Sequence, residues 1–173
     1  MLKYLRTNHR LNHLIVDKNN LSTNYAFAAI ALVIAAGTTL RNFSAANCNL
    51  SDYFGKSFAE SMKSNRGLAK LNLYGNMLTC TTLSLLADAI RISPGKLTHI
   101  NLGKNHLKDK GGTKFGETLA RMNSLVKIDL SDNNLTDETA IAINKSLPFA
   151  ISIKELNLGM NLIHIRQLEM IQA

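Results

Sequence analysis

The stretch LVKIDLSDNNL, residues 125–135, decides the fold, because its pattern of four apolar positions returns five more times in the chain, four of them with its asparagine. The six copies start at Leu11, Leu40, Leu68, Leu97, Leu125 and Ile153, which gives a nearly constant period along the chain. Positions one, four, six and eleven are apolar in every copy. With 46% apolar residues in the chain, this agreement would arise by chance with a probability of about 10⁻⁸. The chain is therefore built from repeats.

Each copy begins with a short strand that has one buried face. Positions four and six lie two residues apart and point to the same side of a strand, whereas positions three, five and seven point to the other side. Position nine holds Asn19, Cys48, Asn76, Asn105, Asn133 and Asn161. A buried amide at this position can pair with backbone groups of the turn, and a thiol is a small substitute for it. We interpret these residues as scaffold rather than as ligands.

The second half of each copy has the pattern of a helix that packs onto the strand. Position twelve is a hydroxyl residue in four copies, where it can cap a helix: Ser22, Ser51, Thr79 and Thr136. Positions nineteen and twenty-three are apolar one turn apart, as in Phe58 and Met62. One unit alone cannot bury both of its apolar faces, so neighbouring units must stack and share a core.

The repeats LAKLNLYGNML (68–78) and LTHINLGKNHL (97–107), with the other copies of the pattern, resemble the leucine-rich repeat family. The spacing between the starts of the copies resembles the ribonuclease-inhibitor-like subclass. This resemblance implies an α/β fold, a curved leucine-rich repeat solenoid with parallel inner strands and outer helices, in about six repeats over residues 11–173. We expect a single domain, with residues 1–10 as an N-terminal cap or the end of a preceding helix. The last unit stops about seven residues short, so the chain is a fragment of a longer protein or its final helix is the cap.

An unbroken apolar run, YAFAAIALVIAA, occupies residues 25–36. It is too short for a membrane span, and a signal peptide would need a leader that already contains a repeat in phase. We therefore interpret the run as the first repeat's helix. Its outer side carries Phe27, Ala31 and Ile34, where later helices carry charged residues. This side is a candidate second interface, covered by residues 1–10, by a second copy of the chain or by a partner.

Catalytic and metal-binding motifs are absent from the sequence. The two cysteines, Cys48 and Cys80, do not form a disulfide framework and suit a reducing, intracellular compartment. Neither the five histidines nor any glycine-rich stretch matches a metal or nucleotide motif. Gly111 and Gly112 open a helix, where close packing is favoured over an anion site. We predict no cofactor, no metal and no enzymatic activity.

The exposed strand face is the candidate binding surface, because members of the resembled subclass usually bind proteins on their concave strand face. Its centre is predicted to contain Lys70, Asn72, Tyr74, His99, Asn101, Lys127 and Asp129. The net charge of +8 favours a protein partner with an acidic surface, and the alternative is nucleic acid or another polyanion. A plain solvated sheet, with the amides at position five forming a cross-strand ladder, is the competing interpretation for any single residue.

The resemblance also suggests where such a protein works. Ribonuclease-inhibitor-like repeats occur in eukaryotic regulators and in effectors that bacterial pathogens send into host cells. The chain is rich in Asn and Lys, has two Cys and lacks Trp, unlike the cysteine-rich vertebrate inhibitors. This composition favours a secreted bacterial effector, acting in the host cytoplasm, or a similar intracellular adaptor.

Overall fold

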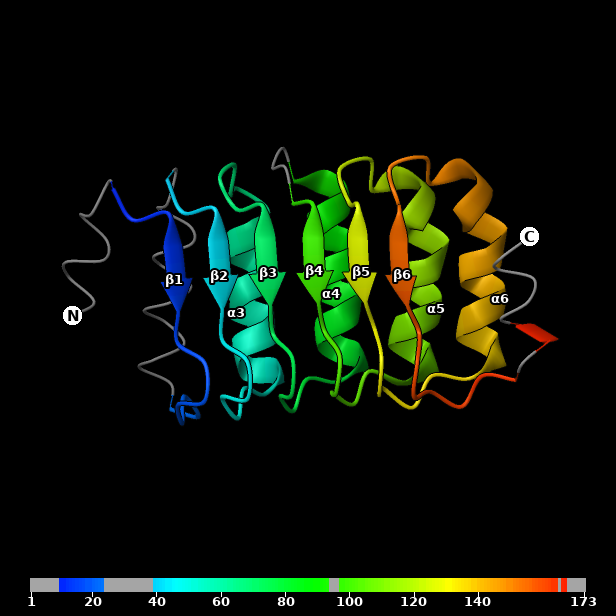
Figure 1. Cartoon of the computed structure of the whole chain (residues 1–173), viewed down its shortest axis with the longest axis horizontal. Helices are drawn as coiled ribbons and strands as arrows, with labels where there is room; N and C mark the ends of the chain where they lie inside the picture. The colour runs from blue at the N-terminus through cyan, green and yellow to red at the C-terminus, as the bar shows by residue number, and fades with distance from the viewer. Residues whose placement is uncertain (1–9, 24–38, 94–96, 165, 168–173) are drawn as a thin grey trace.

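A single parallel sheet runs along the whole described chain, as Figure 1 shows. A computed structural model gives the positions of residues 10–23, 39–93, 97–164, 166 and 167. The strands are β1 (His13–Ile15), β2 (Asn42–Ser44), β3 (Lys70–Asn72), β4 (His99–Asn101), β5 (Lys127–Asp129) and β6 (Glu155–Asn157). They pair in sequence order, and each residue lies beside the residue at the same repeat position of the next strand. The predicted parallel, in-phase sheet is confirmed.

Each regular strand covers positions three to five of its repeat, and is shorter than the pattern suggested. The hydrogen bonding between repeats nevertheless continues beyond the strand. The Leu73 N–H donates to the Asn101 carbonyl at 2.8 Å, and the Gly75 N–H donates to the Gly103 carbonyl at 2.9 Å. The repeats are therefore joined along the strand and along the turn that follows it.

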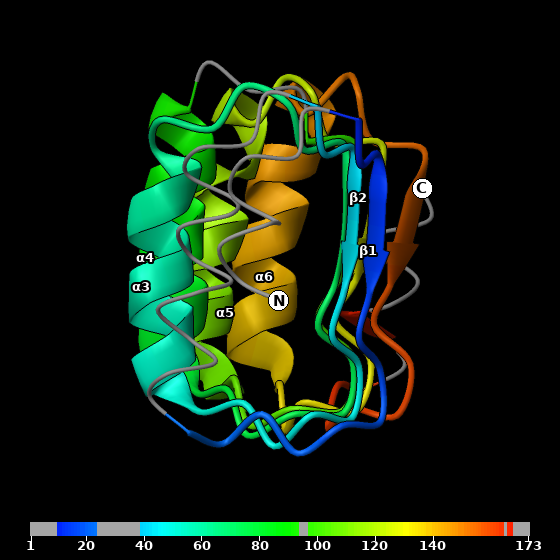
Figure 2. The ribbon, with the colours of Figure 1, turned by 90° about the vertical axis from the view of Figure 1, so that its left-hand side faces the viewer.

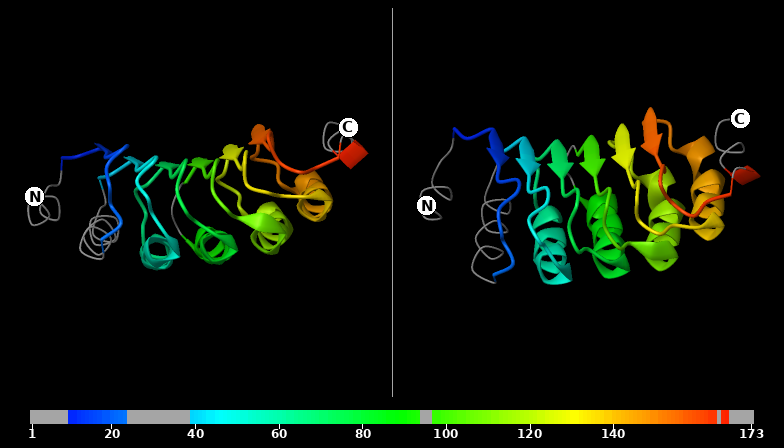
Figure 3. Two further views of the ribbon diagram at one scale, coloured as in Figure 1. Left: turned by 90° about the horizontal axis from the view of Figure 1, so that it is seen from below. Right: turned by 60° about the horizontal axis from the view of Figure 1, so that its bottom comes forward.

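The described helices cover one face of the sheet and leave the other open, as Figure 2 shows. They are α3 (Asp52–Met62), α4 (Cys80–Ile92), α5 (Lys108–Thr118) and α6 (Asp137–Ser146), with 3-10 turns at Leu119–Arg121 and Leu147–Phe149. The Thr79 and Thr136 hydroxyls cap α4 and α6 by accepting from backbone N–H groups at 3.2 and 3.4 Å, whereas Ser51 makes no such bond. In the views of Figure 3 the row of strands is bowed, with the helices on the outer side.

The core lies between the helices and the sheet and continues from one repeat to the next. Phe43, Phe54 and Phe58 fill it near β2, with ring centroids 6.0 Å apart for Phe43 and Phe58 and 5.4 Å apart for Phe54 and Phe58. The leucines at positions six and eleven of the third to fifth repeats, such as Leu73 and Leu78, are fully buried. The apolar positions that defined the repeat are therefore the positions that exclude water.

The asparagines at position nine connect each turn to the preceding repeat. The Asn133 amide donates to the Leu102 carbonyl at 2.9 Å and the Leu130 carbonyl at 3.2 Å, and its oxygen accepts from the Leu107 N–H at 3.3 Å. Asn76, Asn105 and Asn161 repeat this arrangement. In the second repeat the Cys48 thiol lies 3.1 Å from the Val16 carbonyl instead. The predicted scaffold role is confirmed for the buried asparagines and for the substituting thiol.

Aspartates at the start of two helices join neighbouring helices. The Asp109 carboxylate accepts from the Thr136 N–H at 2.8 Å and from the Thr139 hydroxyl at 2.7 Å. A Cβ added to Gly112 would lie 2.2 Å from the Thr139 hydroxyl oxygen, so only glycine allows this approach. Asp52 makes the same set of bonds to the helix that follows it. Close packing is the role of Gly112, as the sequence indicated.

Two predicted features lie outside the described residues. The first is the helix expected over residues 25–36 with its outer residues Phe27, Ala31 and Ile34, and the second is the N-terminal cap except for Arg10. Both stay predictions. Among the residues whose positions are given, no helix has the length and apolar character that a membrane crossing requires.

Candidate functional site: the open strand face

The open face of the sheet contains a shallow concavity of about 340 Å³ that crosses β1 to β5. It is lined by residues at positions three and five, because these positions point away from the helices, and by the buried position between them. The polar lining residues are His13, Asn42, Ser44, Lys70, Asn72, His99, Asn101, Lys127 and Asp129. The bowing seen in Figure 3 places this face on the inner side of the curve.

Six of the seven predicted site residues line this concavity, and Tyr74 does not. The Tyr74 ring instead packs over the next turn, where its Cδ2 atom lies 3.0 Å from the point that a Cβ of Gly103 would occupy. Tyr74 is half-buried there. It therefore flanks the concavity at the turn end of the strands and does not stand in its centre.

Hydrogen bonds along position five form the predicted polar ladder, but only in two pieces. The Ser44 hydroxyl donates to Asp17 at 2.6 Å and accepts from the Asn72 amide at 3.0 Å. At the other end of the sheet the Asn157 amide donates to Asp129 at 3.1 Å. Between the two pieces lies Asn101, whose side-chain amide bonds to neither neighbouring strand within the described structure. The ladder is therefore broken in the middle of the concavity.

The Asn101 side chain is held in one orientation by its own turn. Its oxygen accepts from the Gly103 N–H at 3.0 Å. Because the oxygen is engaged with the backbone, the NH₂ group is the part of the amide that remains available. Both neighbouring acceptors are engaged elsewhere, since Asp129 accepts from the Ser131 N–H and hydroxyl at 2.9 and 2.6 Å as well as from Asn157.

A row of basic groups at position three runs beside Asn101. Lys70, His99 and Lys127 are direct neighbours in the register of β3, β4 and β5. Lys127 forms an ion pair with Glu155 on β6, and both side chains are exposed. The hydrogen bond from Lys127 lowers the pKa of Glu155, and the same contact raises the pKa of Lys127. Lys127 is thus partly neutralised, whereas Lys70 forms no ion pair with any residue of the described ranges.

Two influences act on His99. Burial, followed by the positive charges of Lys70 and Lys127, lowers the pKa of its imidazole below the ordinary value. The ring is also fixed, because its Nδ1 atom lies 2.8 Å from the Thr98 hydroxyl, which donates to the Ala69 carbonyl at 3.0 Å. The single hydroxyl proton is used by that carbonyl, so Nδ1 carries the proton that it shares with the Thr98 oxygen. The other nitrogen, Nε2, accepts when the ring is neutral and donates when it is charged.

Sequence reasoning missed part of the site at both ends. His13, Ile15, Asn42 and Ser44 extend the concavity toward β1, and the Ile15 side chain is 69% exposed. The pairing of Lys127 with Glu155 was also missed. The sequence contained the signal for this pair, because Lys127 and Glu155 occupy the same position of consecutive repeats and therefore lie side by side on adjacent strands.

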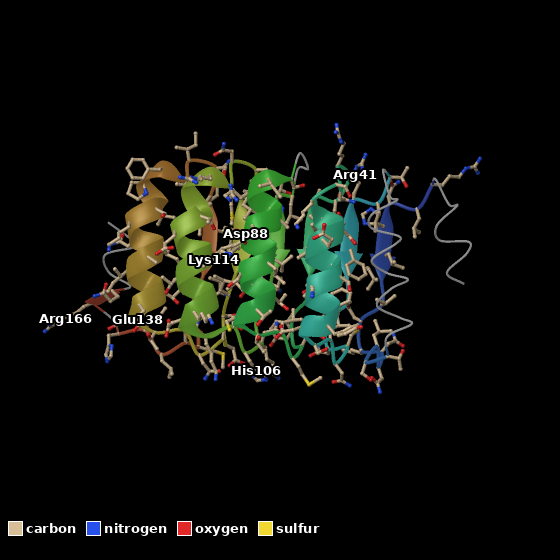
Figure 4. All side chains as sticks on the ribbon, turned by 180° about the vertical axis from the view of Figure 1, so that it is seen from behind. Arg41, Asp88, His106, Lys114, Glu138 and Arg166 are labelled. Atoms are coloured by element: carbon tan, nitrogen blue, oxygen red, sulfur yellow. The ribbon has the colours of Figure 1, made fainter. Side chains whose placement is uncertain are left out.

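The helix side of the molecule presents a different surface. Figure 4 shows Asp88 on α4 and Lys114 on α5 facing one another, and their charged atoms lie 2.5 Å apart. Around them are exposed side chains of both signs, such as Lys56, Glu60 and Glu117. Charges of both signs are present on the described helices, and one lysine there is already paired with an aspartate.

Comparison with known proteins agrees with this architecture. A family model described as Leucine Rich repeat matches residues 96–116 and 121–143. The chain is a leucine-rich repeat protein. Mouse (Mus musculus) NACHT, LRR and PYD domains-containing protein 14 is 25% identical over 135 residues, which are 78% of this chain and 14% of that protein. The chain thus spans a small part of this relative's length.

Solved structures share the leucine-rich repeat fold at low sequence identity. Leiomodin-1 actin-binding site 2 matches with a TM-score of 0.70 and 16% identity, over 87% of each chain. The tropomodulin C-terminal domain of Caenorhabditis elegans matches with a TM-score of 0.70 and 17% identity, over 87% of this chain and 90% of that one. Assignment of these leucine-rich repeats to the ribonuclease-inhibitor-like subclass rests on repeat length and stays a prediction.

Proposed function

We propose that this leucine-rich repeat protein is a non-catalytic binding module whose open strand face holds a protein partner with an acidic surface. The observation that carries the proposal is the concavity of about 340 Å³, which is open, lies on rigidly paired strands and is lined by polar and basic side chains. Rigid donors lose little conformational freedom on binding, and a net charge of +8 steers acidic partners toward the protein. One chain with this fold is named for an actin-binding site, which supports a protein as the class of partner.

Nucleic acid or another polyanion is the second candidate, and the row of Lys70, His99 and Lys127 is the observation in its favour. Two observations weigh against it. Glu155 pairs with Lys127, and negative Asp129 lines the same concavity. Tyr74 packs over Gly103 and does not line the concavity, so it provides no stacking platform for a base within it. These contacts favour a protein surface of mixed polarity over a phosphate backbone.

We also propose that the module acts inside a cell, as a bacterial effector in host cytoplasm or as an adaptor. The supporting observation is that Cys48 and Cys80 are both free thiols. Burial raises the pKa of the Cys48 thiol, which keeps it protonated and unreactive. A measurement of both thiols after purification under oxidising conditions, and of the chain's stability with each thiol blocked, tests whether the fold tolerates an oxidising compartment.

The experiment that tests the binding proposal selects ligands from a displayed library of random peptides and maps their site with variants. Lys127→Glu reverses a charge in the concavity and is expected to slow association. Tyr74→Ala is expected to weaken binding by about 2 kcal/mol if the partner reaches the flank of the concavity. Lys110→Glu makes the same charge change on exposed α5 and is the control.

The outcome of the mapping separates the candidates. Loss of affinity in the strand-face variants, with Lys110→Glu unchanged, supports the proposal. Peptides that bind every variant equally would refute it and would locate binding on the helix side or at an end of the solenoid. A steep salt dependence, with similar losses for every lysine removed, would instead favour a polyanion.

A further inference from the structure

We propose that Lys70, His99 and Asn101 form a carboxylate-binding site at the centre of the open face, which takes an Asp or Glu side chain of an acidic partner segment and gains a proton at His99 as it does so. The inference rests on the proposed function, because it requires a protein partner on this face. It adds the recognised group, the residues that hold it and a dependence on pH.

The first argument is the unused donor of Asn101. Its amide oxygen is engaged with the Gly103 N–H at 3.0 Å, so the NH₂ group is the part of the amide that is left for another acceptor. The Asn72 amide, one strand away, is engaged with Ser44, and the Asn157 amide is engaged with Asp129. Asn101 is the amide of this row for which no protein acceptor is found in the described structure. An acceptor supplied by a ligand would complete the row.

The second argument is the position of two further donors beside that amide. His99 lies two residues before Asn101 on the same strand, so both side chains are on the same face. Lys70 lies beside His99 in the neighbouring strand, about 4.8 Å away across the sheet. Because Nδ1 of His99 is held by Thr98, Nε2 is the nitrogen that remains for a ligand. An imidazole, an ammonium and an amide are thus placed on neighbouring positions of one concavity, where a carboxylate ligand can accept from all three.

The third argument is that the face already holds one carboxylate in this manner. Glu155 projects from position three of β6 and pairs with Lys127, the next residue along the basic row. Glu155 therefore acts as an internal ligand that occupies one lysine. Lys70, at the other side of His99, has no such partner in the described ranges. The side of the row toward β3 therefore lacks the internal carboxylate that occupies Lys127 on the side toward β6.

The coupling to pH follows from the charges that surround His99. These are Lys70 on β3, Lys127 on β5 and Glu155 on β6, and Asp129 on β5 lines the same concavity. Burial and the two lysines lower the pKa of His99 in the free protein. A bound carboxylate adds a negative charge at Nε2 and favours the protonated ring. Affinity therefore rises as the pH falls through the pKa of His99 in the complex toward its lower pKa in the free protein, provided that the carboxylate ligand remains ionised.

The test uses a fluorescent oligoglutamate peptide as the probe, with a glycine-serine peptide of equal length as the uncharged comparison. Lys70→Gln is expected to weaken binding roughly ten-fold, whereas Lys56→Gln, the same change on exposed α3, is expected to leave it unchanged. Asn101→Asp keeps the acceptor for Gly103, removes the NH₂ donors and adds a negative charge beside Asp129, so it is expected to weaken binding at least as much. Glu155→Gln releases Lys127 and is expected to strengthen binding several-fold.

Measurements at different pH values test whether His99 gains a proton when the peptide binds. We expect wild-type affinity for oligoglutamate to rise roughly three- to ten-fold from pH 8 to pH 6, and His99→Gln to remove this rise. Nuclear magnetic resonance of the His99 ring is expected to give a higher pKa in the peptide complex than in the free protein. An unchanged pKa of His99 on saturation with peptide would overturn the inference.

The remaining outcomes distinguish this site from general attraction and from the proposed function. Equal competition by a DNA oligonucleotide, with Lys56→Gln as damaging as Lys70→Gln, would mean that any polyanion binds and would overturn the carboxylate site. Library-selected peptides that depend on Lys127 and Tyr74, but respond neither to Lys70→Gln and Asn101→Asp nor to pH, would leave the protein-binding function standing and reject this inference alone. If neither the Lys127 and Tyr74 variants nor the Lys70 and Asn101 variants changed peptide binding, both the proposed function and this inference would be rejected.

Discussion

Replacement of Asn133 by Ala tests what holds one repeat to the next. The Asn133 side chain is fully buried. It donates to the carbonyls of Leu102, Leu130 and Ser131 at 2.9, 3.2 and 2.9 Å, and it accepts from the Leu107 N–H at 3.3 Å. Alanine removes all four bonds and leaves a methyl group that can form none of them.

The loss of stability in Asn133→Ala depends on how deeply the backbone groups that lose their hydrogen bonds are buried. Leu102, Leu107 and Leu130 have no exposed surface, so water does not reach their backbone groups without local opening. A buried polar group left without a hydrogen bond costs about 1 to 3 kcal/mol. The cost is smaller for a carbonyl oxygen that still accepts a bond on its second lone pair than for an N–H group, which has only one proton to donate. We therefore expect Asn133→Ala to lower the free energy of unfolding by about 3 kcal/mol, mainly through Leu107.

The assay is urea unfolding followed by circular dichroism, with two controls. Asn19→Ala removes the same amide from the same repeat position, but Asn19 is exposed, so water can replace its bonds to Val16 and Asp17 at 3.0 and 3.1 Å. A loss below about 1 kcal/mol is expected there. Lys114→Ala breaks an exposed ion pair with Asp88 and is expected to cost less than about 1 kcal/mol. Equal losses for Asn19→Ala and Asn133→Ala would refute the argument from burial.

Three other expectations concern the helix side. Burial alone would raise the pKa of Asp109, but hydrogen bonds from Thr136 and Thr139 outweigh it and lower the pKa. The contribution of these bonds to stability is thus complete above about pH 4 and is lost as the pH falls through the lowered pKa. In an acid titration, Asp109→Asn is therefore expected to lose less unfolding free energy than the wild type does. Gly112→Ala is expected to lower the melting temperature, because of its contact with Thr139, although alanine usually favours a helix. Combined Phe27→Lys and Ile34→Lys is expected to change light scattering or solubility, and no change would reject an interface there.

The sequence predicted the fold well because each structural role is repeated along the chain. The buried positions four and six are apolar in every repeat, so a single unusual residue such as Ala45 does not obscure the pattern. The turn asparagine is likewise seen several times, and its one replacement, Cys48, still bonds to the preceding repeat. Averaging over copies therefore gives reliable strands, turns and helices.

The site was less predictable, because it depends on differences between copies. Position seven places Tyr74 on the open face, but its ring occupies space that a side chain at Gly103, in the turn after the next strand, would contest. Position five places Asn72 and Asn101 in one row, yet only Asn72 finds a partner across the sheet. These outcomes depend on which side chains are neighbours across two strands. A comparison of one repeat position at a time does not contain that information.

In the helix layer one set of residues recurs after two repeats rather than after one, which an alignment of single repeats does not show. The set Asp52, Gly55, Thr79 and Thr82 recurs two repeats later, with one constant offset, as Asp109, Gly112, Thr136 and Thr139. It joins α3 to α4 and, identically, α5 to α6. The two pairs of helices are therefore equivalent units, each held by an aspartate that bonds to the following helix.

The junction between these two units is built differently, and it lies directly behind the candidate carboxylate site. Between α4 and α5 the backbone of Cys80 approaches Gly111, where an added Cβ would lie 2.8 Å from the Cys80 Cα, and the exposed pair of Asp88 and Lys114 bridges the outer surface. Lys70 belongs to the repeat of α4, whereas His99 and Asn101 belong to the repeat of α5. The spacing between the strands that carry these donors is set by the parallel pairing of β3 with β4, and behind them tight backbone contact takes the place of the half-buried aspartate. Glycine at position 111 therefore allows α4 and α5 to approach closely behind the two strands that carry the site.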